Sequence, residues 1–486
     1  MLTRRIAILC LAVAPLAAQS QRMSAANEPR ERSGAGGAPA SERDGGSGGA
    51  KPPDEQDVAW DRVQTEATTL LQQYVRIDTS NPPGNVAKAA DFLQAIFQRE
   101  GIPVQRYESG PGRSIIVARL RASASAGASA GQAGRGKPIL LLHHMDVVPV
   151  DRSRWTHDPF AAEISAGRLW GRGSMDMKGI GIAHLMAFLT LKREKVPLGR
   201  DVILMAVPDE EVGGTLGNRW MLDHHYGDLD PEYVLDEGGF GSPDLFAAGK
   251  RVYGISVAEK KILWLKLTAE GVSGHGSQPH DKNPNDRLIR ALAKLLAEPM
   301  PTASFTVLDT MRQRVGTFAE NKFTNAIQHS TISITSLRSG VGDPPKVNVI
   351  PSIAEATIDC RLLPGTTRAA WLAELTRRLG DPGITITVTY ESEDPIVTST
   401  DTPLYHALEA ALHRHDPSAI VTPMLIPYGT DSNSYRPKGV KSYGFFPGMV
   451  PAEAIASMHG DGEFIPVDQL MPAARILFEA LKETAK

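Results

Sequence analysis

The chain has 486 residues, and its 52 lysines and arginines nearly balance its 55 aspartates and glutamates, for a formal net charge of −3. This length predicts two domains, and 42% hydrophobic with 22% charged residues is typical of an ordinary globular protein. The charge balance gives no sign of a basic surface for nucleic acid or for a membrane, so neither is expected as a partner.

The first twenty residues have the pattern of a secretory signal peptide. Arg4 and Arg5 form a basic start, the apolar run 6–16 follows, and small alanines stand after it. The run is too short to span a bilayer, so a retained membrane anchor is the less favoured alternative. We expect residues 1–20 to be removed, which leaves a secreted or periplasmic protein without stable membrane insertion.

Residues 21–55 are rich in glycine, alanine, serine, proline and charge, and they contain almost no large apolar side chain. A segment of this composition cannot bury enough apolar surface to order itself. We therefore expect a disordered tether there, and an exposed loop at the second low-complexity run, 122–136.

The next part of the chain alternates between helical patterns and apolar strands. We expect helices over 56–76, 86–100, 179–193 and 403–414, and strands over 114–120, 138–144, 201–208 and 232–236. Continuous apolar strands that alternate with helices predict an α/β fold, with a mostly parallel sheet covered by helices on both faces.

A different rhythm occupies the middle of the sequence. Strand patterns at 261–270, 330–337, 353–362 and 384–390 are interleaved with helical patterns at 286–297 and 367–379. The order strand, helix, two strands, helix, strand predicts a ferredoxin-like α+β domain. We expect it to span 259–394 and to be inserted between two parts of a catalytic domain, 56–258 and 395–486.

Four groups of acidic and histidine residues stand near the ends of predicted strands, around His144, Asp176, Glu210 and Glu237. Open parallel sheets bind ligands at the carboxyl ends of their strands, so these side chains should share one rim. So many carboxylates repel one another unless a cation lies between them. Histidine with aspartate and glutamate, and without cysteine, suits zinc, cobalt or manganese.

The spacing within two of these groups is informative. His144 and Asp146 are two residues apart, so in an extended segment they point to the same side, and Asp146 can hold the imidazole from behind. Glu210 and Glu211 are neighbours and point apart, so one can bind metal while the other faces the substrate. A carboxylate in that position can take a proton from water whose pKa a metal has lowered to about 7.

These residues lie in motifs that resemble a known family. The chain contains HHMDVVP, WGRGSMDMKG, DEEVGG, LDEGG, VAEKK, SGHGSQP, NVIP, IDCR, YGTDSNSY and SMHGDGEFIPVDQL in that order. Over roughly 57–484 it is similar to the aminoacylase, succinyl-diaminopimelate desuccinylase and glutamate carboxypeptidase group of metallopeptidases, and most of all to carboxypeptidase S and secreted N-acyl amino acid hydrolases. The resemblance implies a zinc-exopeptidase-like fold with an inserted lid or dimerisation domain.

The resemblance also implies a set of metal ligands. Asp176 would bridge two divalent metal ions, most simply zinc, with cobalt or manganese as alternatives. His144 and Glu237 would complete the site of one ion, and Glu211 and His459 that of the other. In such a site Glu210 would be the general base that activates the attacking water and later protonates the leaving nitrogen, and Asp146 would support a ligand from behind.

Substrate contacts follow from the same resemblance. His275 matches a histidine that steadies the developing oxyanion, often from a dimer partner, and a homodimer through the inserted domain is therefore possible. Asn348 and Arg361 match positions that grip the substrate, and an arginine can hold a carboxylate with two parallel hydrogen bonds. Gly429 and Thr430 match a substrate loop lined by backbone.

One position departs from the family pattern. Many relatives carry an arginine where this chain has Asn433, and the next arginine is Arg436, which aminoacylase-like members match. Arg436 is therefore the candidate for holding a substrate carboxylate, although the loss at position 433 puts that specificity in question.

The sequence thus predicts a dinuclear metal-dependent hydrolase that cleaves an amide bond of N-acyl amino acids or small peptides. The alternatives are a catalytically silent binding protein on the same scaffold and a deacylase of another specificity, such as a deacetylase or desuccinylase. A serine hydrolase is disfavoured, because the residues around Ser174 do not complete the nucleophile motif Gly-x-Ser-x-Gly.

Overall fold

The computed structural model describes residues 58–123 and 136–486, which fall in one compact unit that begins at Val58. The predicted signal peptide and tether, and most of the predicted loop at 122–136, lie outside the described residues. Within the described part, no helix has the length and apolar character needed to cross a bilayer.

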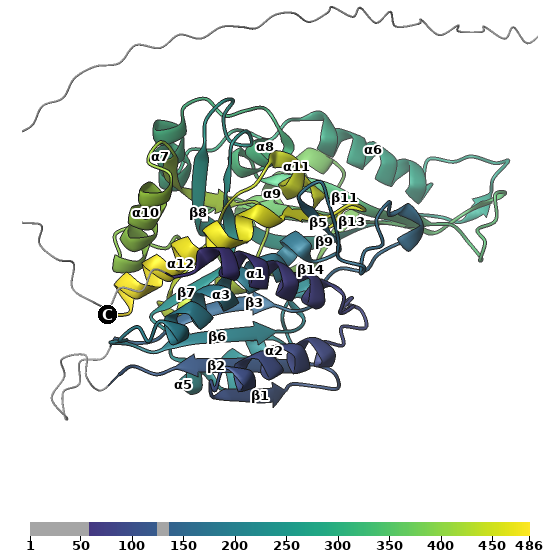
Figure 1. Ribbon diagram of the computed structural model, residues 1–486. Coiled ribbons are helices and arrows are strands. Elements are labelled where there is room, and N and C mark those ends of the chain that lie inside the picture. The colour runs from purple at the N-terminus through teal and green to yellow at the C-terminus, as the bar shows by residue number, and fades with distance from the viewer. Residues whose placement is uncertain (1–57, 124–135) are drawn as a thin grey trace, which may run out of the picture. The chain divides into compact units, whose positions relative to one another are not determined.

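An eight-stranded sheet forms the centre of the molecule (Figure 1). Its strands in spatial order are β1 (Val104–Glu108), β2 (Ser114–Leu120), β6 (Val202–Val207), β3 (Ile139–His144), β7 (Tyr233–Ser242), β16 (Lys441–Met449), β8 (Val252–Glu259) and β15 (Ile420–Ile426). The central run from β6 to β16 is parallel, as is the pair β8 and β15, whereas β1 and β2 add antiparallel strands at one edge. Strand β8 also pairs antiparallel with β16 and with β7, so the sheet is mixed, and the predicted α/β fold is confirmed.

Helices cover both faces of this sheet because its strands are apolar on both sides. In β3, Ile139 and Leu141 belong to the larger core, while Leu140 and Leu142 face a second core. The larger core is covered by α1 (Trp60–Val75), α2 (Ala87–Arg99), α3 (Gly179–Arg193), α10 (Pro403–His415) and α12 (Leu470–Thr484). The second core is covered by α4 (Asn218–His224) and α5 (Tyr226–Leu229).

Helix α3 lies deepest, with every residue from Gly179 to Leu191 buried. A helix that is apolar on all sides must be enclosed on all sides, and α3 is packed between the sheet and the helices α1 and α12. Its Gly181 is required by this close approach, because a Cβ there would lie 2.6 Å from the imidazole of His143.

The insert has the predicted ferredoxin-like order. Its antiparallel sheet runs β11 (Thr331–Ser339), β13 (Ile353–Leu362), β9 (Lys261–Glu270) and β14 (Ile384–Glu391). Strand β9 alternates between buried and less buried residues along its length, as expected when only one face is covered. The covering helices are α6 (Pro284–Ala297) and α9 (Arg368–Leu379), which share a separate core with the sheet.

Three features go beyond the sequence-based expectations. Between α6 and β11 the chain returns to the catalytic core as α7 (Thr306–Val315) and α8 (Lys322–Gln328), so the range predicted for the insert contributes to two cores. A two-stranded ribbon, β10 (Gly274–His275) with β12 (Val349–Ile350), extends the insert. Strand β7 continues to Ser242, so Glu237 lies within the strand rather than after it.

Candidate metal centre

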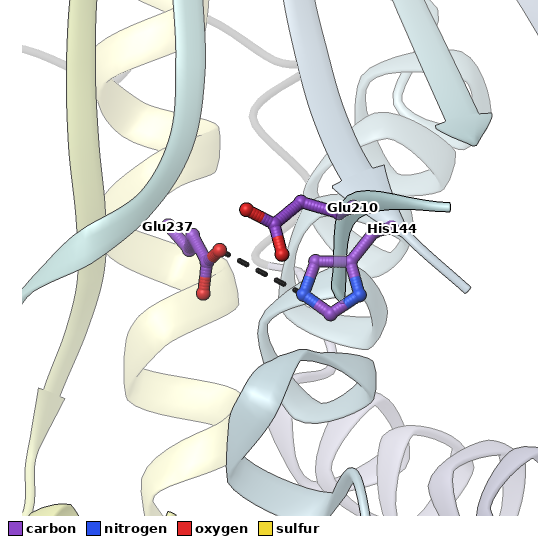
Figure 2. Close-up of side chains that lie close together, drawn as sticks. All are labelled: His144, Glu210 and Glu237. Carbon is purple, nitrogen blue, oxygen red and sulfur yellow. Dashed lines mark ion pairs between the residues drawn. The ribbon is translucent and has the colours of Figure 1, made fainter. Parts of the chain in front are cut away.

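His144 ends β3, and both of its ring nitrogens have partners. Nδ1 lies 2.9 Å from the backbone oxygen of Asp146. Nε2 lies 3.2 Å from Oδ1 of Asp176 and 3.7 Å from Oε1 of Glu237. Figure 2 shows His144 and Glu237 facing each other, with Glu210 beside them. One ligand atom from each of these three residues lies within 4.8 Å of the others, which is close enough to surround one ion.

Asp146 contacts His144 through its backbone more closely than through its carboxylate. Its carboxylate is 3.7 Å from His144 Nδ1, too far for a hydrogen bond, so the backbone oxygen orients the ring instead. The carboxylate accepts hydrogen bonds from Asn81 Nδ2 at 2.8 Å and from the backbone nitrogens of Glu210 and Glu211 at 3.2 and 3.4 Å. Asp146 therefore positions the two glutamates as well as the histidine.

Asp176 lies between two histidines. Its Oδ1 faces His144, while its Oδ2 is 3.1 Å from Nε2 of His459. His459 Nε2 is also 3.1 Å from Oε2 of Glu211. The two oxygens of one carboxylate thus point at two separate groups, His144 with Glu237 and His459 with Glu211. This is the geometry of a bridging ligand, and the five predicted ligands come together in it.

A buried ion pair holds the turn that carries Asp176. Glu463 Oε1 accepts from the backbone nitrogens of Met175 and Asp176, at 2.8 and 3.0 Å. Its Oε2 accepts from the backbone nitrogen of Gly173 at 3.0 Å and from Arg172 Nη1 at 2.7 Å. Four donors on one carboxylate leave the turn Ser174–Lys178 little freedom.

The same pair also supports the second histidine. Arg172 Nη2 donates to the backbone oxygen of Gly460 at 3.0 Å, directly after His459. His459 itself has a left-handed backbone with φ of 62°, a strained conformation for a residue other than glycine. Arg172 and Glu463 were missed in the sequence because they bind no metal. Glu463 could have been suspected from the sequence, because it is an acidic residue in the same motif as His459.

The electrostatics of the site favour bound cations. Hydrogen bonds to Asp176 and Glu211 raise the pKa of His459 to about 10. Burial raises the pKa of Glu237, and the nearby Asp176 raises it further. Burial would also raise the pKa of Asp176, but the hydrogen bonds from its two histidines outweigh it and lower that pKa. Several carboxylates thus lie close together in a buried site, and their mutual repulsion favours a cation between them.

One buried oxygen without a hydrogen-bond partner also favours a bound cation. Oε1 of Glu211 is buried and has no hydrogen-bond partner among the described residues, which is costly for a carboxylate oxygen. A divalent cation held by Glu211, Asp176 and His459 would satisfy it. The donor set of two imidazoles and three carboxylates suits zinc, cobalt or manganese, so the residues fit a pair of such ions.

Glu210 lies beside His144 and Glu237, within reach of the same ion. It opens the short turn η3 (Glu210–Val212) after Asp209, whose φ is 78°, and no hydrogen bond to its carboxylate is found among the described residues. Burial raises the pKa of Glu210, and the neighbouring Glu211 raises it further, while His144 acts in the opposite direction. A carboxylate with raised proton affinity and free oxygens can receive a proton.

A cavity of about 680 Å³ opens beside these groups, which is large enough for a small-molecule substrate. Of the predicted substrate residues, Arg361, Gly429 and Thr430 line it. Much of the wall is apolar, and its apolar members include Leu245, Ile262, Trp264, Phe323, Ala326, Tyr428, Ile455 and Met458.

Three predicted substrate residues lie elsewhere. His275 and Asn348 are exposed neighbours in the ribbon of the insert, where the Gly276 nitrogen donates to the Asn348 oxygen at 2.7 Å, and neither lines the cavity. Arg436 is buried and forms an ion pair with Glu259. The expectation that Arg436 holds a substrate carboxylate is therefore not supported by its position, because the guanidinium already has a buried acid.

An α/β sheet with a bridging aspartate between two histidine–carboxylate pairs, beside an apolar cavity, defines a metallopeptidase-like hydrolase. The chain belongs to Peptidase family M20/M25/M40, whose family model matches residues 140–483. It is 28% identical over 386 residues to aminoacylase-1 of Mus musculus, covering 78% of this chain and 86% of the relative. It is 26% identical over 381 residues to a probable carboxypeptidase S-like 2 of Dictyostelium discoideum, covering 72% of each.

A solved structure shows the same fold. The M20 family metallo-carboxypeptidase Sso-CP2 from Sulfolobus solfataricus aligns with a TM-score of 0.67 and 20% sequence identity, over 86% of this chain and 99% of that one. The chain is therefore a hydrolase of a metal-dependent family, as predicted, and its α/β fold with an inserted domain is the fold of that family.

Proposed function

We propose that this protein is a dinuclear metal-dependent amidohydrolase that cleaves N-acyl amino acids or small peptides, with Glu210 as general base. The observation that carries the proposal is the position of Asp176, whose two oxygens face His144 and His459 separately. Each histidine has a further carboxylate next to it, from Glu237 and Glu211. No other part of the described chain has a comparable group of ligands.

The chain would bind one ion through His144, Glu237 and Asp176, and the other through His459, Glu211 and Asp176. The two ions supply Lewis-acid polarisation of the scissile carbonyl and lower the pKa of water. Glu210 takes a proton from the attacking water and passes it to the leaving nitrogen, and its raised pKa suits it to hold that proton between the two steps.

The substrate class follows from the cavity and from the relatives. Aminoacylases and carboxypeptidase S-like proteins are among the relatives, and both names describe cleavage of an amide. The apolar wall of the cavity, which includes Leu245, Phe323 and Ile455, suits an apolar acyl group or side chain.

Metal analysis and a substrate panel test this proposal together. Purified protein loaded with zinc, cobalt or manganese should hold about two equivalents and hydrolyse some members of a panel of N-acyl amino acids and dipeptides. Glu210→Gln should retain both equivalents and lose at least about 100-fold in kcat, because general acid–base catalysis typically contributes about 100- to 10,000-fold.

Two results would contradict the proposal. Less than one equivalent of metal would favour a silent binding protein on the same scaffold. Turnover by Glu210→Gln at the wild-type rate would show that Glu210 is not the general base. Loss of metal from that variant would show that Glu210 is a metal ligand.

We also propose that the mature protein is secreted or periplasmic, and that the insert mediates a homodimer. Secretion rests on the sequence of residues 1–20, and cell fractionation with N-terminal sequencing of the product tests it. The dimer would explain why His275 and Asn348 lie together on an exposed ribbon. If they act across a dimer, inactive His275→Ala and inactive Glu210→Gln should regain activity when mixed, whereas monomers would not.

A further inference from the structure

We propose that Arg219, assisted by the hydroxyl of Tyr390, binds the carboxylate of the substrate. This rests on the proposed function and names the residue that makes the hydrolase select an acid over a neutral amide. Arg219 is the second residue of α4, which follows the loop that carries Glu210 and Glu211, and it lines the cavity with them.

Arg219 has an unusual set of partners for an arginine in a cavity rich in acids. Its Nη2 donates to the hydroxyl oxygen of Tyr390 at 3.1 Å. No carboxylate lies within 4.0 Å of its guanidinium in the part of the chain that the structure describes. The side chain is only partly buried, so the other N–H groups of its planar fork remain available to a ligand.

Tyr390 complements this arrangement from the other domain. It lies in β14 of the insert, its ring packs against Trp264 with centroids 4.8 Å apart, and both residues line the cavity. The hydroxyl oxygen accepts from Arg219, so its own proton is free to donate. A carboxylate next to the pair would receive charge-assisted hydrogen bonds from the guanidinium and one from the phenol.

The other arginines near the cavity are less suited to this role. Arg361 already makes two hydrogen bonds to Asp359, at 2.8 and 3.0 Å. Arg436 is paired with Glu259 in the interior. Arg219 is thus the arginine of the cavity lining that has no carboxylate within 4.0 Å among the described residues.

The test compares an N-acyl amino acid with the same compound as its carboxamide, using metal-loaded full-length protein. The wild type should prefer the acid, mainly through KM. Arg219→Met should lose about 10- to 100-fold in kcat/KM for the acid, the range expected for charge-assisted hydrogen bonds, and change little for the amide. Arg219→Lys should recover part of the preference, and Tyr390→Phe should lose a smaller part of it.

A matched control separates this role from a general loss of charge or stability. Arg251→Met removes an arginine that pairs with Asp416 and lies outside the cavity lining, and it should leave the acid-to-amide ratio unchanged. A purely structural role for Arg219 would lower both rates together and leave the ratio intact, which would overturn the inference. If the wild type cleaves acid and amide equally, the inference fails while the proposed function stands. If it cleaves neither, the proposed function fails.

Discussion

Replacing Glu463 by glutamine should damage both the stability of the protein and its metal centre. The carboxylate is fully buried, and its partner Arg172 is almost so, with 2% of the side chain exposed. Both oxygens accept two hydrogen bonds each. Glutamine has the same shape and leaves no cavity, but its amide nitrogen can only donate, so at least one pair of N–H donors would face another donor.

The magnitude follows from the burial of the pair. Breaking a buried ion pair by removing one charge typically costs about 3–5 kcal/mol, because the other charge stays buried without compensation. We therefore expect Glu463→Gln to lose about 3–5 kcal/mol in free energy of unfolding. The turn with Asp176 and the backbone before His459 both depend on this pair, so the bridging site should also lose metal.

Urea unfolding of the metal-free proteins measures the stability without the contribution of metal binding, and elemental analysis of the reloaded proteins measures the metal content. Glu453→Gln is the matched control, because Glu453 pairs with Arg168 at the surface, where its side chain is 56% exposed. That variant should lose about 1 kcal/mol or less. A loss below about 1 kcal/mol for Glu463→Gln, with two equivalents of metal retained, would refute the reasoning.

Three further outcomes are expected. Glu211→Gln should bind about one equivalent of metal instead of two, because its carboxylate serves only the group with His459; retention of two equivalents in elemental analysis would contradict its role as a ligand. A chelator should abolish hydrolysis, and added zinc, cobalt or manganese should restore it; turnover that survives metal removal would argue for other chemistry. Burial would raise the pKa of Glu479, but hydrogen bonds from His415 and Arg414 lower it to about 2, from an ordinary 4.5. Its folded-state pKa is therefore depressed, so its stabilisation is present above pH 4.5 and is lost as the pH falls towards 2. Urea unfolding should show Glu479→Gln about 1 kcal/mol less stable than the wild type at pH 7, the size of a partly exposed ion pair, and a smaller difference at pH 3, between the two pKa values; an equal difference at both pH values would contradict this.

The periodicity of apolar residues predicted most of the fold. Strands 114–120, 261–270 and 353–362 and the helix 179–193 begin and end where the structure has them, because burial of a whole strand or of alternate residues leaves a local pattern. The helices α7 and α8 were not predicted, nor was their packing against the catalytic core. Their amphipathic pattern shows one apolar face but not which of two cores it packs against.

From the sequence alone, the acidic and histidine residues near strand ends indicated a metal site, and the motifs, each a short local signal, indicated the family. The pairing of the metal ligands was implied only by the resemblance. The tertiary structure decided which atoms meet. The two oxygens of Asp176 point to different histidines, Arg436 turns inward to Glu259, and Arg219 has no acid beside it in the described part of the chain. These outcomes depend on contacts between distant segments, such as the hydrogen bond from Asp176 to Glu463 across 287 residues, and no local pattern of residues encodes them.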